Sequence, residues 1–155
     1  MKLYKFSGAS MLTVDEKSRL LVPAEVRRKL DAEDTDVFVI KIGNNGKIWL
    51  YPERFYDAKV YDDGAGAEGD EIDPTPEQLE RMLSRSADIY RVPMDKAGRI
   101  LLPEPVMTLT GLGREVALLG VFNHLQLWSR EDYAKRQLAR SSEAQGEPKV
   151  PSQAQ

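Results

Sequence analysis

The sequence predicts a mainly β, α+β protein built from two copies of one ββαββ-like unit. The first observation is a nine-residue stretch that occurs twice with an offset of 80 residues, at 15–23 and at 95–103. Each copy reads Asp, three mostly polar residues, Arg, three aliphatic residues and Pro. The second observation is that strand-like segments and turn residues surround both copies in the same order.

The first unit is expected over residues 6–60. It contains four segments rich in aliphatic, β-branched or aromatic residues, which predict strands: 11–14, 19–22, 37–42 and 48–51. Pro23 ends the second of these and suits the first turn of a short helix over 24–30. Asn45-Gly46 predicts a hairpin between the last two strands. Pro52 then opens a helix to about residue 60.

An acidic, Gly-rich linker is expected over residues 61–75, because it has too few apolar residues to fold by itself. The second unit follows over 76–140. Thr75 and Gln78 have capping-box spacing around Pro76, which predicts a leading helix to about residue 86.

The rest of the second unit repeats the scheme of the first. Its four predicted strands are 89–92, 99–102, 116–122 and 125–128. A short helix over 103–110 is ended by Gly111, and a last helix runs from 129 to about 140. The polar residues 141–155 predict a disordered tail.

A single unit of four short strands would be marginally stable alone. We therefore expect the two units to pair their apolar faces around a pseudo-twofold axis and to close their sheet edges in one joint barrel. The alternative is two separate domains on the Gly-rich linker.

Charge is distributed unevenly along the chain, although the net charge is only −3. Residues 1–30 carry seven Lys or Arg and three Asp or Glu, whereas residues 31–80 carry four and fourteen. A basic N-terminal third suits phosphate binding. The sequence has no Cys, no apolar run long enough to span a membrane and no signal-peptide pattern, which fits the cytoplasm.

The doubled Asp-x-x-x-Arg motif, each copy followed by aliphatic residues and Pro, resembles the MraZ family. So does the strand end Leu127-Trp128 followed by Tyr133. The resemblance covers residues 6–140. It implies two SpoVT-AbrB-like units in a swapped-hairpin β-barrel with flanking helices. Ser18 departs from the pattern because the family often has Gly there, whereas the second copy keeps Gly98.

The resemblance also implies a function. MraZ proteins are bacterial transcriptional regulators that form rings of protomers and bind short repeats in double-stranded DNA. The repeats lie upstream of the division and cell-wall gene cluster, the regulator's own operon, which is usually repressed. The implied location is the cytoplasm and the nucleoid, with a homo-oligomer as the working form.

The motif has a plausible chemistry of its own. Arginine presents a planar fork of donors that fits a phosphate or a guanine edge. Asp15, four residues before Arg19, can accept from loop amides or hold that arginine in one rotamer, which lowers the entropy lost on binding. The alternative is a salt bridge that only closes a turn, and both interpretations apply equally to Asp95 and Arg99.

The two copies differ in their surroundings. The helix after the first copy contains Arg27-Arg28-Lys29, whereas the aligned residues of the second unit are Met107-Thr108-Leu109. We therefore expect the first unit to face DNA and the second motif to be mainly structural, with Asp15, Asp95 and Arg99 bracing their loops. The alternative for the basic helix is a solvated face. The predicted DNA contacts are Lys17, Arg19, Arg27 and Arg28.

Enzyme classes find no support in the sequence, which lacks nucleophile, dinucleotide, P-loop and metal-ligand motifs. The single histidine, His124, is expected to be a polar residue of the second hairpin. We expect no cofactor, no metal, no small-molecule substrate and no membrane partner. Two alternatives to a DNA-binding regulator remain: a ring-forming protein-interaction module that does not bind DNA, and a small AbrB-like antitoxin.

Overall fold

The computed structural model describes residues 4–30, 34–63 and 69–144. Six strands form one antiparallel sheet, and two short strands form a separate ribbon, so the protein is α+β and mainly β, as predicted. The sheet contains β1 (Ala9–Thr13), β3 (Val37–Ile42), β4 (Ile48–Pro52), β5 (Tyr90–Pro93), β7 (Glu115–Val121) and β8 (His124–Ser129). The ribbon contains β2 (Arg19–Leu21) and β6 (Arg99–Leu101).

The strand order shows that the two units interlock. The sheet runs β1-β7-β8-β4-β3-β5. Exchanging each strand with its counterpart in the other unit reverses this order and leaves it otherwise unchanged, which is the predicted pseudo-twofold relation. β1 of the first unit pairs with β7 of the second, and β5 of the second pairs with β3 of the first. The alternative of two separate domains is therefore wrong.

The sheet is open among the described residues, because β1 and β5 are its two edges. The hydrogen-bonded strands of the protein therefore do not form the closed joint barrel that was expected from the sequence. The ribbon β2–β6 lies outside this hydrogen-bonding pattern, yet it contributes to the same core: Leu20 and Ile100 are fully buried. They join sheet residues such as Phe38 and Leu125 in one apolar cluster, and each such side chain stabilises the fold by about 1.5–3 kcal/mol.

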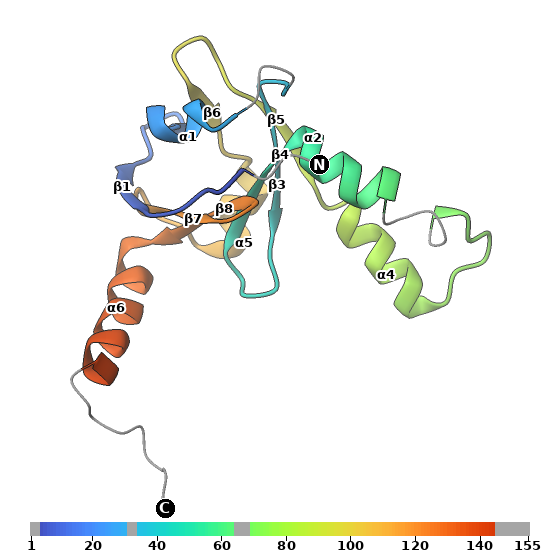
Figure 1. Ribbon diagram of the computed structural model, residues 1–155. Helices are drawn as coiled ribbons and strands as arrows, with labels where there is room; N and C mark the ends of the chain where they lie inside the picture. The colour runs from blue at the N-terminus through green and yellow to red at the C-terminus, as the bar shows by residue number, and fades with distance from the viewer. Residues whose placement is uncertain (1–3, 31–33, 64–68, 145–155) are drawn as a thin grey trace, which may run out of the picture.

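Local signals locate most helices. Pro23 precedes α1 (Ala24–Arg28), and Pro103 precedes α5 (Glu104–Thr110), which Gly111 ends at a φ of 66°. The predicted capping box is present at α4 (Pro76–Arg85): the Thr75 side chain accepts from the Gln78 N–H at 3.2 Å. α4 and α6 (Arg130–Ala144) extend away from the sheet in different directions (Figure 1).

Two helix boundaries differ from the prediction. The helix expected to end near residue 60 is α2 (Glu53–Asp57) followed by a π-helix, η1 (Ala58–Asp63), so helical structure continues into the expected linker. The last helix continues four residues past 140. Of the predicted linker and tail, residues 64–68 and 145–155 lie outside the described residues. Within the described ranges, no helix is both long enough and apolar enough to cross a bilayer.

The predicted hairpin between β3 and β4 is confirmed. Gly43 N–H donates to the Lys47 carbonyl at 2.8 Å, and Gly46 N–H donates to the Gly43 carbonyl at 3.0 Å. Gly46 has a φ of 77°, which glycine adopts without strain.

Candidate nucleic-acid interface

The first motif forms a tight loop closed by the Asp15 carboxylate. Asp15 Oδ1 accepts from the backbone N–H of Lys17 at 2.9 Å and of Arg19 at 2.8 Å. Asp15 Oδ2 accepts from Arg19 Nε at 2.8 Å. One carboxylate therefore closes the loop and also holds the arginine side chain.

The second motif repeats this geometry. Asp95 Oδ1 accepts from the backbone N–H of Ala97 and of Arg99, both at 2.9 Å, and Asp95 Oδ2 accepts from Arg99 Nε at 3.2 Å. The backbone N–H of the arginine is the main cause that lowers the pKa of both Asp15 and Asp95 below the usual range. Both carboxylates are therefore ionised at neutral pH, and the two loops are chemically alike.

A left-handed residue completes each loop. Ser18 has a φ of 62° and Gly98 a φ of 87°, and each donates its N–H to the carbonyl of the loop's Asp at 3.0 Å. This conformation explains why glycine suits the position, since it has no Cβ to strain the backbone. The serine of the first loop adopts the same geometry with a side chain in place.

The ribbon brings the two motifs together. β2 pairs antiparallel with β6 in the register Arg19↔Leu101, Leu20↔Ile100 and Leu21↔Arg99. Because directly opposed residues share a face and side chains alternate, Leu20 and Ile100 point into the core and the other four point outward. We call these four the ribbon face: Arg19, Leu21, Arg99 and Leu101.

The ribbon face is accessible and partly apolar. Leu21 is 51% exposed and Leu101 57% exposed. Each leucine lies directly opposite one of the two arginines, and the arginines are diagonal neighbours, roughly 7–8 Å apart at their Cα atoms. Sequence reasoning missed this face, because no local signal shows that β2 pairs with β6.

The position of Arg27 corrects one expectation. Its Nε donates to the Val22 carbonyl at 3.1 Å, and its guanidinium Cζ lies 3.0 Å from where a Cβ on Gly98 would stand. The basic helix α1 therefore lies against the loop of the second motif. The alignment placed the basic helix beside the first motif only, because it compared helices within each unit. The β2–β6 ribbon crosses between the units, so the same helix also lies beside the second motif.

The other predicted contacts are exposed cations. Lys17 and Arg28 lie on the surface, and neither forms an ion pair with a described residue. Lys96, which the sequence reasoning did not select, is also exposed, in the second loop at the position aligned with Glu16. The structure thus places cations beside both motif loops.

His124 is not the polar loop residue that was expected. It is buried at the start of β8, with its ring centroid 4.7 Å from that of Trp49 and 4.9 Å from that of Tyr51. Its Nε2 lies 3.0 Å from Gln126 Nε2, and its Nδ1 lies 2.9 Å from Asn123 Oδ1. Its role is structural. In the part of the chain that the structure describes, no three His, Cys, Asp or Glu residues gather as metal ligands would.

The interlocked units and the shared ribbon define a two-unit protein that presents paired Asp-x-x-x-Arg loops on one surface. The chain belongs to the MraZ family, as its motifs indicated. It matches the family described as "MraZ protein, putative antitoxin-like" over residues 5–63 and 87–149. The unmatched stretch between these segments includes α4.

Curated relatives from several bacteria agree with this assignment. A protein of Chromobacterium violaceum is 33% identical over 129 residues, which is 81% of this chain and 82% of the relative. One from Neisseria meningitidis serogroup C is 32% identical over 83% of this chain and 82% of its own length. One from Paraburkholderia phytofirmans is 30% identical over 89% of this chain and 92% of its own length. All three are named "Transcriptional regulator MraZ".

Proposed function

We propose that this protein is a transcriptional regulator that binds double-stranded DNA with the ribbon face and the cations around it. The relatives' name supports the regulatory role. The single observation that supports the DNA site is the β2–β6 pairing, which gathers two carboxylate-held arginines on one accessible surface.

The geometry suits recognition of a duplex. A two-stranded ribbon fits the major groove of B-DNA, where arginine bonds the guanine O6/N7 edge and apolar groups contact the thymine methyl. Arg19 and Arg99 supply the first kind of group and Leu21 and Leu101 the second. Because Asp15 and Asp95 already fix the arginine side chains, less rotamer entropy is lost on binding.

Cations at the margins would contact the phosphates and position the ribbon. Lys17 extends the first loop, Lys96 the second, and Arg27 lies beside Gly98 with Arg28 next to it on α1. The proposed site therefore includes both motifs. The sequence had predicted a DNA site on the first unit alone, because the basic helix α1 belongs to that unit. We extend the site to the second motif because α1 also adjoins the loop of that motif.

The finer features follow from the family resemblance and belong to the same proposal. The working form is a ring of protomers, and the target is a set of short repeats upstream of the protein's own operon, the division and cell-wall gene cluster. The regulator acts in the cytoplasm, on the nucleoid, as a repressor. A ring on repeated sites gains affinity through avidity, so weak contacts per protomer suffice.

The resemblance also implies a closed swapped-hairpin barrel. We propose that the ribbon closes the open sheet in this sense: β1 continues into β2 and β5 into β6 through the motif loops, and Leu20 and Ile100 share the core of the sheet.

A gel shift with DNA from upstream of the protein's own gene tests the function. The expected result is a shift that unrelated DNA of equal length does not compete away and that high salt abolishes. Light scattering of the same sample gives the number of protomers. A protein that assembles but shifts no upstream fragment would instead be a protein-interaction module.

A further inference from the structure

We propose a second binding site, separate from the ribbon face, that takes a small organic phosphate with a planar apolar group, such as a nucleotide. The site is a cavity of about 530 Å³ between β3, β4, α2, η1 and the C-terminal end of α4. This volume lies in the range of small-molecule sites. The residues that define its chemistry are Lys41, Lys59, Arg85, Tyr51 and Phe55.

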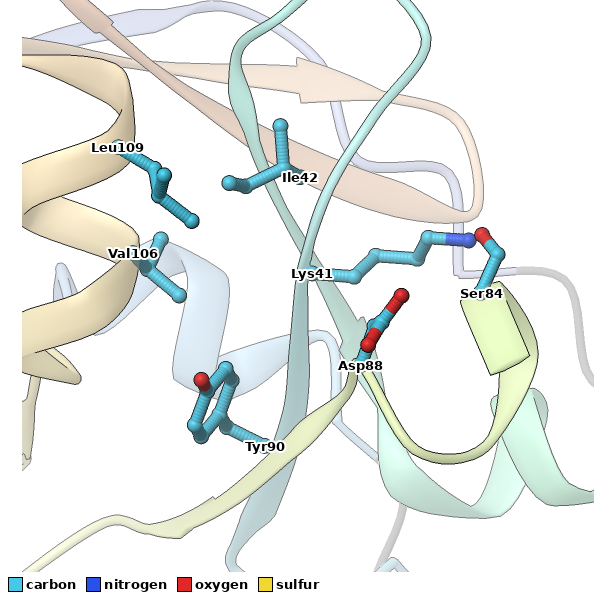
Figure 2. A pocket seen from close by; sticks show the side chains of 7 residues that line it. All are labelled: Lys41, Ile42, Ser84, Asp88, Tyr90, Val106 and Leu109. Carbon is cyan, nitrogen blue, oxygen red and sulfur yellow. The ribbon is translucent and has the colours of Figure 1, made fainter. Parts of the chain in front are cut away.

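Lys41 is one of the cations that line this site, and it lies between this cavity and an adjoining pocket. Its side chain is half-buried, and its ammonium group forms no hydrogen bond or ion pair with any described residue. Burial first, and then the nearby Arg85, lower the pKa of Lys41, while Asp88 opposes them. In the adjoining pocket, the Lys41 side chain extends from β3 toward Ser84 and Asp88 (Figure 2). A bound anion would supply the partner that this half-buried ammonium group lacks.

The fold does not require a cation at this position. The second unit shows which residue stands at the equivalent place. In the first unit Lys41 pairs with Trp49, and in the second unit Leu119 pairs with Gln126, the counterpart of Trp49. Leu119 is thus the counterpart of Lys41 and lines the equivalent surface beside Trp128. The first unit has a lysine where the same scaffold accepts an aliphatic side chain, which indicates a role other than folding.

Tyr51 supplies an uncommitted donor in the same cavity. Its hydroxyl has no hydrogen-bond partner among the described residues, although burial raises its pKa and keeps the proton in place at neutral pH. The neighbouring Tyr56 is different, since its hydroxyl donates to the Arg85 carbonyl at 3.0 Å. A hydroxyl and an ammonium group without protein partners therefore line the same cavity, where one ligand can bond to both.

The composition of the walls selects the ligand class. Three cations from three different elements, Lys41, Lys59 and Arg85, line the cavity, and no acidic residue is among its described lining. Phosphoryl oxygens match such a cluster. The Tyr51 and Phe55 rings lie parallel at 4°, with centroids 6.0 Å apart, and extend an aromatic stack that includes His124. A planar base can pack against this edge.

Isothermal titration of the full-length protein tests the site, with ATP and pyrophosphate as probes. We expect saturable binding of both, with ATP the tighter because its base packs against the rings. Lys41→Met keeps the apolar stem and removes the charge, and it should weaken both probes about tenfold or more. Tyr51→Phe removes only the hydroxyl and should weaken both severalfold.

Lys135→Met is the matched control, because Lys135 is an exposed lysine of α6 away from this cavity. It should leave both affinities unchanged. Equal weakening by Lys41→Met and Lys135→Met, or no saturable binding at millimolar probe, would overturn the proposal. DNA binding is measured in parallel on the same proteins. A Lys41→Met protein that loses DNA affinity but keeps ATP affinity would assign Lys41 to DNA and overturn it too.

Discussion

Arg27 of the first unit lies directly over Gly98 of the second, with guanidinium atoms 3.0–3.1 Å from the position a Cβ would occupy. The close approach joins the basic helix of one repeat to the motif loop of the other. A side chain at residue 98 would be in tight contact with this guanidinium. The proposed DNA surface is therefore shared between repeats, and changes at either residue should affect it.

Gly98→Ala should destabilise the protein by about 1–2 kcal/mol, mainly because alanine would be strained at a left-handed φ of 87°, and also because its Cβ would be in tight contact with Arg27. Urea unfolding measures the change. Gly113→Ala is the matched control, since a Cβ there meets no atom within 4 Å and no left-handed φ is required. Equal stability of the two variants would show that the loop tolerates a side chain.

Ser18→Gly should have the opposite effect. Ser18 holds a φ of 62° that costs a residue with a Cβ roughly 1–2 kcal/mol, while glycine loses about 0.5–1 kcal/mol more backbone entropy on folding. The net expectation is stabilisation by up to about 1 kcal/mol, seen as a higher urea midpoint. A lower midpoint would mean that the serine side chain stabilises the fold by more than the strained backbone conformation costs.

Local signals made much of the fold predictable. The repeated motif located both loops, prolines located α1 and α5, and Asn45-Gly46 located the hairpin. The exchange of β1 and β5 between units was not predictable. The residues of β1 pair with partners 102–110 positions away and those of β5 with partners 50–56 positions away, and such pairing depends on packing that no local pattern encodes. Lys41 was missed for a related reason: one lysine in an apolar strand looks like an ordinary solvated position until the cavity beside it is seen.

Asp15→Asn should weaken DNA binding about two- to tenfold without unfolding the protein. The Asn Oδ1 can still accept from the Lys17 and Arg19 N–H groups, but its amide now faces Arg19 Nε, a donor, so the arginine is no longer held. Fluorescence anisotropy with upstream DNA measures the affinity.

Removing any negative charge strengthens attraction to DNA, so this prediction needs a charge-matched control. Asp57→Asn removes a carboxylate of α2 that lies outside both motif loops and pairs with Arg91. It should bind DNA as well as the wild-type protein or slightly better. If Asp15→Asn behaves in the same way, the carboxylate does not organise Arg19 for binding.

His124 should make the protein less stable in mild acid. Burial lowers the pKa of His124 in the folded state below its ordinary value of 6.5. As the pH falls below about 6.5, the unfolded chain takes up a proton that the folded chain does not, so the free energy of unfolding decreases. Urea midpoints at about pH 7.5 and about pH 5.5 should differ in the wild-type protein.

The matched variant is His124→Gln, which removes the only histidine and keeps a polar side chain. It is expected to be less stable at both pH values, since the packing against Trp49 and Tyr51 is lost. The difference between its urea midpoints at the two pH values should nevertheless be smaller than in the wild-type protein. An undiminished difference would place the acid sensitivity elsewhere.

The most direct test of the proposed site is the DNA affinity of Arg19→Ala and Arg99→Ala, compared with Lys135→Ala as the control for one lost positive charge. Both arginines lie on the ribbon face, each held by its own carboxylate. We predict that each ribbon variant loses binding to upstream DNA by at least tenfold while keeping its oligomeric state, and that Lys135→Ala binds like the wild-type protein. Wild-type affinity in both ribbon variants would contradict the assignment of this face to DNA.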